Sequence, residues 1–271
     1  MDFAEYLEKT ARNNDSIVCF GIDPVIERIP LKLKGTGRRI TKFYSEMLSA
    51  IADDIAAVKP NYAYFAQYGF DGLKALEKII AVAKKEKLPV ILDAKRGDIG
   101  KSSEAYSKEV FGFWKADAVT VSPYMGTDSV LPFITQSKGV YVLVRTSNPG
   151  SRDLQQLPMK SGKELFMETA GKVLEWGTGA VVGATNISEL GRIARFFAAA
   201  NRKTPLLIPG VGSQGGNASE VAEMLKAANR SIAMHRINSS SGISYAYEKY
   251  GGNYVAAAEK AVKELNSEIG L

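Results

Sequence analysis

The sequence predicts a (β/α)8 barrel of the TIM type, formed by a single domain over residues 1–271 with an extra helix before the first strand. Eight short runs rich in β-branched residues recur along the chain, and each is followed by a turn and an amphipathic stretch. The runs are apolar without clean alternation, which is typical of parallel strands covered on both faces. Repeats of about thirty residues and a total of about 250 residues are usual for this barrel. The predicted strands are residues 17–22, 55–59, 89–95, 118–122, 140–145, 180–184, 205–209 and 231–237.

The segments before and between the strands carry helix signals. Asp2 and Glu5 have the spacing of a capping box ahead of the first strand. Further along, apolar residues recur at helical spacing. Examples are Leu73, Leu76, Ile80 and Ala83, and also Val221, Met224, Leu225 and Ala228. A doubly wound open sheet is the main alternative, but its Gly-rich dinucleotide turn is missing after the first strand, where residues 21–24 read Gly-Ile-Asp-Pro.

The composition is that of an ordinary globular protein, with 45% apolar and 24% charged residues among 271. Cys19 is the only cysteine, so neither an intramolecular disulfide nor a cysteine-based zinc site can form. A reducing, cytoplasmic location is the corresponding expectation. The acidic residues 1–5 do not resemble a secretory leader, and no stretch is apolar for long enough to span a bilayer.

The net charge of +6 is carried by basic residues dispersed among acidic ones, as at residues 84–87. We interpret them as solvated helix faces, so neither a nucleic acid nor a membrane is expected as a partner. A modest positive field would also steer a small anionic substrate toward the protein.

Polar or charged residues lie at the carboxyl end of nearly every predicted strand or directly after it. In a (β/α)8 barrel the functional groups lie at the carboxyl ends of the strands, so this pattern predicts a site there. These residues are Asp23, Lys59, Asp93 with Lys95 and Asp98, Ser122, Ser147, Thr185, residues 210–216 and residues 238–242.

Two of these segments indicate particular chemistry. Asp93 and Lys95 are two residues apart on a predicted strand, so their side chains should point to the same side, within reach of Lys59 and followed by Asp98. An ion-pair network that closes the barrel is the structural alternative. The glycine-rich residues 208–216 precede a helix and should bring backbone N–H groups toward a phosphate, unless they form only a tight turn.

Five motifs in this order resemble those of orotidine 5′-phosphate decarboxylases, in the longer-chain branch of that family. The first is the D-x-K-x-x-D pattern of Asp93, Lys95 and Asp98, which is weak evidence by itself. The others are Gly-Ile-Asp-Pro at 21–24, Val-Lys-Pro at 58–60, Thr-Ser-Asn-Pro at 146–149 and Pro-Gly-Val-Gly-Ser-Gln-Gly at 209–215. The five together extend over most of the chain and make the resemblance specific.

The resemblance implies a homodimer that converts orotidine 5′-phosphate to uridine 5′-phosphate and carbon dioxide in pyrimidine biosynthesis, without a cofactor or a metal. Lys59, Asp93, Lys95 and Asp98 match the family's charged tetrad, with Asp98 reaching the site of the other subunit. Lys95 would protonate the pyrimidine C6 as carbon dioxide leaves. Asp93 would lie against the substrate carboxylate while the lysines stabilise the developing carbanion, which is preorganised electrostatic catalysis.

Further positions match substrate-binding residues of the family. Asp23 and Lys59 would bind ribose hydroxyls, and Asp98 and Ser102 would do so across the dimer interface. Ser147 would bind the pyrimidine edge. Gln214 would bridge the base and the phosphate from a loop that closes over the substrate. The remaining expected substrate-binding residues are Ser122, Gly210, Gly212, Gly215, Ser240 and Ser241.

Ser241 is a departure from the family, which usually has an arginine there to bind the phosphate. Losing a bidentate arginine should weaken phosphate binding by several kcal/mol, roughly the scale of a charge-assisted contact. Two interpretations remain: either turnover is reduced and Ser241→Arg restores it, or Arg236 or another base compensates. Arg236 lies on the predicted last strand at a different depth.

Two other functions remain open. A sugar-phosphate decarboxylase or aldolase of the same suprafamily would use magnesium, but it would need an acidic ligand where this chain has Lys59. A catalytically silent nucleotide-binding protein would keep the fold without turnover. The only histidine, His235, is interpreted as a packing residue of the last strand.

Overall fold

The computed structural model describes residues 1–135, 137–200, 202–212, 215–229 and 231–271. In these ranges eight parallel strands form one sheet in the order β2-β1-β8-β7-β6-β5-β4-β3. Isolated parallel bridges from Val58 to Val90 and from Asn61 to Asp93 join the two edge strands, β2 and β3, and close the barrel. The (β/α)8 fold is therefore confirmed. The strands are β1 Val18–Ile22, β2 Ala57–Pro60, β3 Ile91–Arg96, β4 Ala118–Val121, β5 Gly139–Arg145, β6 Gly179–Val182, β7 Leu206–Pro209 and β8 Arg236–Ser239.

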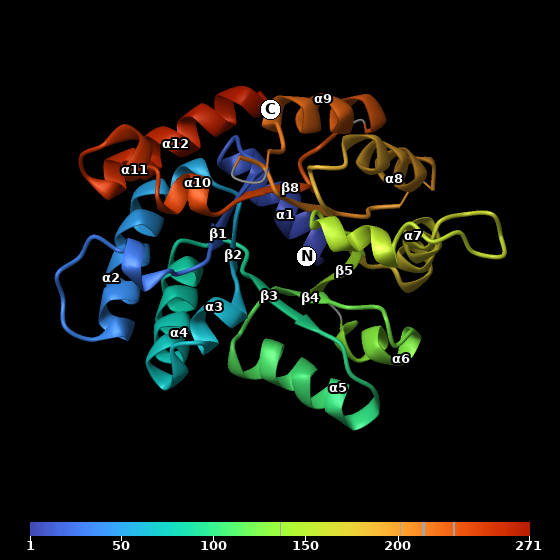
Figure 1. The fold of residues 1–271 in the computed structure, drawn as a ribbon, viewed down its shortest axis with the longest axis horizontal. Helices are drawn as coiled ribbons and strands as arrows, with labels where there is room; N and C mark the ends of the chain where they lie inside the picture. Colours follow the sequence, from blue (N-terminus) through green and yellow to red (C-terminus); the bar gives the residue numbers. More distant parts are fainter. Residues whose placement is uncertain (136, 201, 213–214, 230) are drawn as a thin grey trace.

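Helices follow the strands and form a ring around them (Figure 1). None of the helices in the described ranges has the length and apolarity that crossing a lipid bilayer requires. The longer helices are α1 Phe3–Asn13, α2 Thr36–Ile51, α4 Gly69–Lys85, α5 Gly100–Ser107, α7 Leu165–Trp176, α8 Ile187–Ala199, α9 Ala218–Ala228 and α12 Tyr254–Ile269. The short ones are α3 Tyr62–Ala66, α6 Thr127–Val130, α10 Ser241–Ser244 and α11 Tyr247–Tyr250, with single turns such as η1 Ile26–Arg28.

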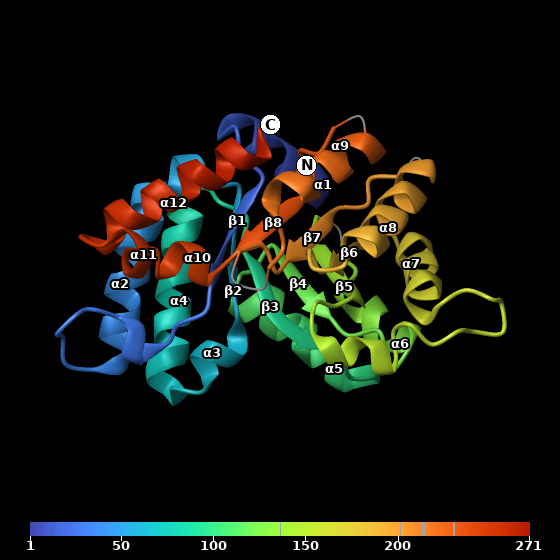
Figure 2. The ribbon, with the colours of Figure 1, turned by 45° about the horizontal axis from the view of Figure 1, so that its top comes forward.

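The extra helix α1 lies at the amino-terminal end of the barrel, beyond the starts of the strands at the top of the view in Figure 2. Its predicted capping box is present: the Asp2 carboxylate accepts from the Glu5 N–H, and the Glu5 carboxylate accepts from the Asp2 N–H. Phe3 packs its ring edge-on against Tyr141 at the start of β5, with 5.9 Å between ring centroids. Phe3 and Leu7 belong to the same apolar cluster as residues inside the barrel. Helix α1 therefore covers the barrel interior at the amino-terminal ends of the strands.

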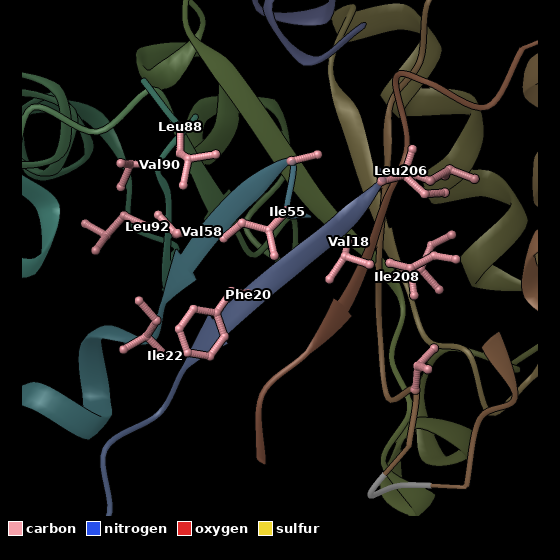
Figure 3. Close-up of a cluster of buried hydrophobic side chains, with 14 of the residues drawn as sticks. Val18, Phe20, Ile22, Ile55, Val58, Leu88, Val90, Leu92, Leu206 and Ile208 are labelled. Atoms are coloured by element: carbon pink, nitrogen blue, oxygen red, sulfur yellow. The ribbon is translucent and has the colours of Figure 1, made fainter. Parts of the chain in front are cut away.

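The strands separate two apolar layers because successive side chains point to opposite faces. On β1, the side chains of Val18, Phe20 and Ile22 belong to the outer layer between strands and helices, and Figure 3 shows them among apolar side chains of neighbouring strands. Cys19 between them belongs to the smaller inner layer. The inner layer contains Phe3, Leu7, Cys19, Ala57, Ile91, Ala118, Tyr141, Val181 and Leu207.

The last strand begins later than the sequence predicted. Residues 231–237 were expected to be extended, but the strand is Arg236–Ser239. Before it the chain turns, and the His235 N–H donates to the Ile232 carbonyl. The residue types in this segment do not predict the turn, because the hydrogen bond that closes it joins two backbone groups and involves no side chain. The shift makes Arg236 the first residue of β8, at the same end of the barrel as α1.

Candidate active site

A cavity of about 710 Å³ lies at the carboxyl ends of the strands. Its walls come from residues far apart in the sequence, because parallel strands bring their carboxyl ends together at one rim. Eight of the predicted site residues line it: Asp23, Lys59, Asp93, Lys95, Ser147, Gly210, Ser240 and Ser241.

Asp93 is the centre of the charged groups in this cavity. Its Oδ2 accepts from Lys59 Nζ at 2.8 Å, and its Oδ1 accepts from Lys95 Nζ at 2.7 Å. Lys59 and Asp93 are only 4% and 8% exposed, whereas the Lys95 side chain is 51% exposed. Lys59 and Asp93 therefore form a buried ion pair, and the Lys95 ammonium is a second positive charge that faces the open cavity.

The inner pair keeps its charges despite its burial. Burial alone would raise the pKa of the Asp93 carboxyl, but Lys59 and Lys95 outweigh it and hold this pKa well below its usual range. Burial alone would lower the pKa of Lys59, but the Asp93 and Asp23 carboxylates raise it above its ordinary value. At neutral pH the site therefore presents an ionised carboxylate next to a charged lysine.

Lys95 reaches Asp93 by a different route from the predicted one. The register between β3 and β4 shifts between Leu92 and Arg96, and Lys95 adopts a left-handed backbone with φ of +45°. Regular alternation along a strand therefore does not explain why the two side chains meet. A non-glycine residue in this conformation costs roughly 1–2 kcal/mol, so the surrounding contacts must hold it in place.

Thr120 is one of these contacts, and the sequence reasoning missed it. Its Oγ1 donates to Asp93 Oδ1 at 2.9 Å and accepts from the Lys95 N–H at 3.0 Å. Thr120 is buried within β4, two residues before Ser122, the residue that was predicted for this strand. A threonine inside a β-branched run resembles a packing residue, so no sequence signal distinguishes it.

Two carboxamide or carboxylate oxygens in the cavity lack a hydrogen-bond partner among the described residues. They are Asp23 Oδ1 and Asn238 Oδ1, and both are buried. Asn238 lies on β8 and also lines the cavity, although it was not singled out beyond its place in the segment 238–242. Buried acceptors of this kind normally have a partner, so the two oxygens are suited to hydroxyl groups of a ligand.

Ser147 lies on the loop after β5 and lines the cavity. Hydrogen bonds from the Arg145 side chain hold this loop in place. The Arg145 side chain is buried, and it donates to the Thr146 carbonyl at 2.9 Å and to the Ser151 hydroxyl. Across from this loop, a Cβ on Gly183 would lie 2.8 Å from the backbone of Ser147. Only glycine permits this close approach between the ends of β5 and β6.

Backbone hydrogen bonds join the described residues of the glycine-rich loop after β7 to one another. The N–H groups of Gly212, Gly215 and Gly216 donate to the carbonyls of Gly216, Gly212 and Gly210 respectively. These three N–H groups are therefore bonded within the loop, and its role in binding a phosphate stays a prediction. Gln214 lies outside the described residues. An adjoining cavity of about 630 Å³ is lined by the predicted residues Gly212, Gly215 and Ser241.

Four of the predicted residues, Asp98, Ser102, Ser122 and Thr185, line neither of these two cavities of the single chain. The Thr185 hydroxyl donates to the Ser147 carbonyl. The Asp98 carboxylate accepts from the Ile99 N–H. Ser102 is exposed on α5, and the Ser122 N–H donates to the Arg96 carbonyl. Their assignment to a substrate site stays a prediction.

Arg236 points away from the carboxyl ends of the strands. Its side chain is fully buried, and Nη2 donates to the carbonyl of Leu7 in α1. The other acceptors are the carbonyls of Ala56, Ala233 and His235. Arg236 therefore ties α1 to the barrel and does not replace the arginine expected at Ser241.

The chain is similar to proteins of known activity. The model of the orotidine 5′-phosphate decarboxylase / HUMPS family matches residues 17–251. The orotidine 5′-phosphate decarboxylase of Cupriavidus metallidurans is 44% identical over 253 residues, which cover 91% of this chain and 90% of the relative. That of Cupriavidus taiwanensis is 42% identical over 276 residues, covering 99% and 98%. The solved structure of Leishmania donovani OMP decarboxylase is 30% identical with a TM-score of 0.79 and covers 100% of both chains.

Proposed function

Because the chain belongs to the orotidine 5′-phosphate decarboxylase / HUMPS family, we propose that Lys59, Asp93 and Lys95 perform the chemistry by which it converts orotidine 5′-phosphate to uridine 5′-phosphate and carbon dioxide. This reaction of pyrimidine biosynthesis makes the chain a carboxy-lyase. The observation that carries the assignment of residues is the Asp93 carboxylate bound by two lysines at the carboxyl ends of the strands.

The charges are arranged for loss of a carboxylate. A substrate carboxylate placed against ionised Asp93 is repelled, and this repulsion disappears when neutral carbon dioxide leaves. The electron pair of the broken C–C bond stays on the pyrimidine C6, where the nearby ammonium groups stabilise it. Lys95, the lysine that faces the cavity, then donates a proton from Nζ to C6 and regains one from solvent.

The binding groups are consistent with a nucleotide. Asp23 and Asn238 offer buried oxygens without partners in the described residues, which suit ribose hydroxyls. Ser147 lines the same cavity and is proposed to bind the pyrimidine edge. Remote contacts of this kind provide binding energy that orients the reacting carbon over the lysine.

We also propose that the enzyme is a cytoplasmic homodimer with shared sites, in which Asp98 and Ser102 serve the neighbouring subunit. Asp98 is displaced from the cavity of its own chain and lies close to α5. Large apolar side chains are exposed on α5 and on the segments next to it, as a subunit interface would require. These are Ile99, Tyr106, Tyr124, Met125 and Leu131.

The proposed function is tested by following the loss of orotidine 5′-phosphate absorbance in the presence of a chelator. Steady turnover that needs no added magnesium is expected, and Lys95→Ala should abolish it. Turnover only with magnesium, on a sugar phosphate, would favour the other enzymes of the suprafamily. Tight binding of uridine 5′-phosphate without any turnover would instead favour the silent nucleotide-binding protein.

A further inference from the structure

We propose that Arg28, on the turn after β1, supplies the guanidinium that binds the substrate phosphate in this chain, which has Ser241 in place of an arginine. The inference rests on the proposed function, since it assumes a nucleotide in the larger cavity. Arg28 and Ser241 both line the larger cavity and the adjoining one, so the guanidinium lies at their junction. Val211 of the glycine-rich loop lines both cavities as well.

The other basic side chains that line the two cavities have different roles. Lys59 and Lys95 bind the Asp93 carboxylate. Lys249 lines only the adjoining cavity, and its Nζ donates to the Tyr250 hydroxyl. Within the described ranges, Arg28 is therefore the one cation that borders both the glycine-rich loop and the nucleotide cavity.

The Arg28 side chain packs on the Tyr245 ring, which is itself held by hydrogen bonds. Its guanidinium carbon lies 3.8 Å from the centroid of the Tyr245 ring, which is the geometry of a cation–π contact. The Tyr245 hydroxyl in turn donates to the Asp23 carbonyl and accepts from the Val25 N–H. Because these bonds connect the turn after β1 to the segment after β8, the position of Arg28 is set by both strands.

The guanidinium keeps a free edge for an anion. Its Nε and Nη2 donate to the two oxygens of Glu248 at 2.9 and 2.6 Å. An arginine has five N–H donors, so three remain on Nη1 and Nη2 after this pair is formed. Two donors along that edge match two phosphate oxygens, and the side chain of Arg28 is 39% exposed. Glu248 is therefore a positioning residue that orients the arginine without using up its donors.

The experiment compares the binding of uridine 5′-phosphate and of uridine by isothermal titration calorimetry. Arg28→Ala should weaken binding of the nucleotide about 30-fold or more, the scale of a lost charge pair, and leave uridine binding unchanged. Arg28→Gln, which keeps part of the stem over Tyr245, should do the same. The matched control is Arg192→Ala, because Arg192 makes an equivalent two-point ion pair with Glu164 away from both cavities.

A second pair of variants separates this proposal from weak phosphate binding. Ser241→Arg should restore nucleotide affinity in the Arg28→Ala background and change it little in the native chain. An unchanged nucleotide affinity in both Arg28 variants would overturn the proposal, as would a large gain from Ser241→Arg in the native chain. If the native chain neither binds uridine 5′-phosphate nor decarboxylates its precursor, the proposed function itself has failed, which is a distinct outcome.

Discussion

Lys59 and Asp93 form a buried ion pair, with 2.8 Å between Nζ and Oδ2, at the base of the cavity. The pair is formed by side chains of adjacent strands, β2 and β3, which are also the strands whose isolated bridges close the barrel. The main electrostatic element of the site therefore lies where the sheet closes. Disturbing it should affect both stability and turnover.

Comparing Lys59→Met with a double variant should separate the effect of the ion pair on stability from its effect on turnover. Lys59→Met leaves the buried Asp93 carboxylate without its inner partner, and this should lower the free energy of unfolding by about 3 kcal/mol. The double variant Lys59→Met/Asp93→Asn should recover most of that stability, because no buried charge is left unpaired, but it should remain inactive. Urea unfolding and the decarboxylation assay measure the two effects. A double variant no more stable than Lys59→Met would contradict this account.

The left-handed backbone of Lys95 predicts an unusual order of stability. Lys95→Gly should be more stable than Lys95→Ala by about 1 kcal/mol, because glycine adopts this conformation without strain. Both variants should be inactive, since each lacks the proposed proton donor. Thermal unfolding of the two proteins makes the comparison, and a more stable alanine variant would show that the left-handed backbone relaxes when the lysine side chain is lost.

Thr120 should act as a positioning residue. Thr120→Val keeps the shape of the side chain but removes the donor to Asp93 and the acceptor for the Lys95 N–H, which should cost about 1–3 kcal/mol of stability. We expect kcat to fall roughly 10-fold with KM nearly unchanged, as an effect on the transition state would require. Thr120→Ser retains the hydroxyl and should rescue kcat. If serine and valine behave alike, the hydroxyl has no such role.

His235 should make the protein less stable in mild acid. Burial, followed by the charge of Arg236, lowers the pKa of His235 from 6.5 to about 3. At pH values between these two pKa values, His235 binds a proton in the unfolded chain but stays neutral in the folded chain. The free energy of unfolding therefore falls as the pH falls, by up to about 1.4 kcal/mol per pH unit.

The measurement is the urea midpoint at about pH 7 and about pH 5, where His235 passes from neutral to charged in the unfolded chain. The control His235→Asn offers a side-chain oxygen to the Leu206 N–H, which now donates to His235 Nδ1, and it does not titrate. Its midpoint should change less with pH than that of the native protein. Equal slopes in the two proteins would assign the acid sensitivity to other groups.

The proposed homodimer with shared sites predicts complementation between two inactive variants. Lys95→Ala and Asp98→Ala should each be inactive alone. After unfolding and refolding together in equal amounts, half of the dimers are mixed, and each mixed dimer contains one intact site. About a quarter of the native activity should therefore return. No recovery, with mixed dimers present, would mean that Asp98 serves its own subunit.

The sequence was sufficient to predict the fold because hydrophobic patterning and repeat length are local properties. Its one misplaced strand, β8, follows a turn closed by a backbone bond to Ile232. Within the site, Lys59, Asp93 and Ser147 were predicted from their places at or directly after the carboxyl ends of strands, and the structure brings them to one cavity. Because all the strands run parallel, their carboxyl ends share one rim, whatever their order in the sheet.

Contacts between elements could not be predicted in the same way. Thr120 looks like an ordinary strand residue until the neighbouring strand is placed beside it. Arg236 looked like a possible partner for phosphate, but the start of β8 directs it toward α1. Arg28 had no signal at all, because the groups that orient it, Tyr245 and Glu248, are more than 200 residues away in the chain.

The sequence by itself therefore determined the (β/α)8 barrel, the position of the charged segment from Asp93 to Asp98 and the family to which the chain belongs. Only the tertiary structure decided that Lys95 reaches Asp93 through a left-handed backbone conformation and that Arg28 borders the cavity beside Ser241. The physical reason is that periodicity reports which face of an element is buried. Where a side chain lies along the barrel axis, and which residues distant in the sequence it contacts, depend on how all the elements pack.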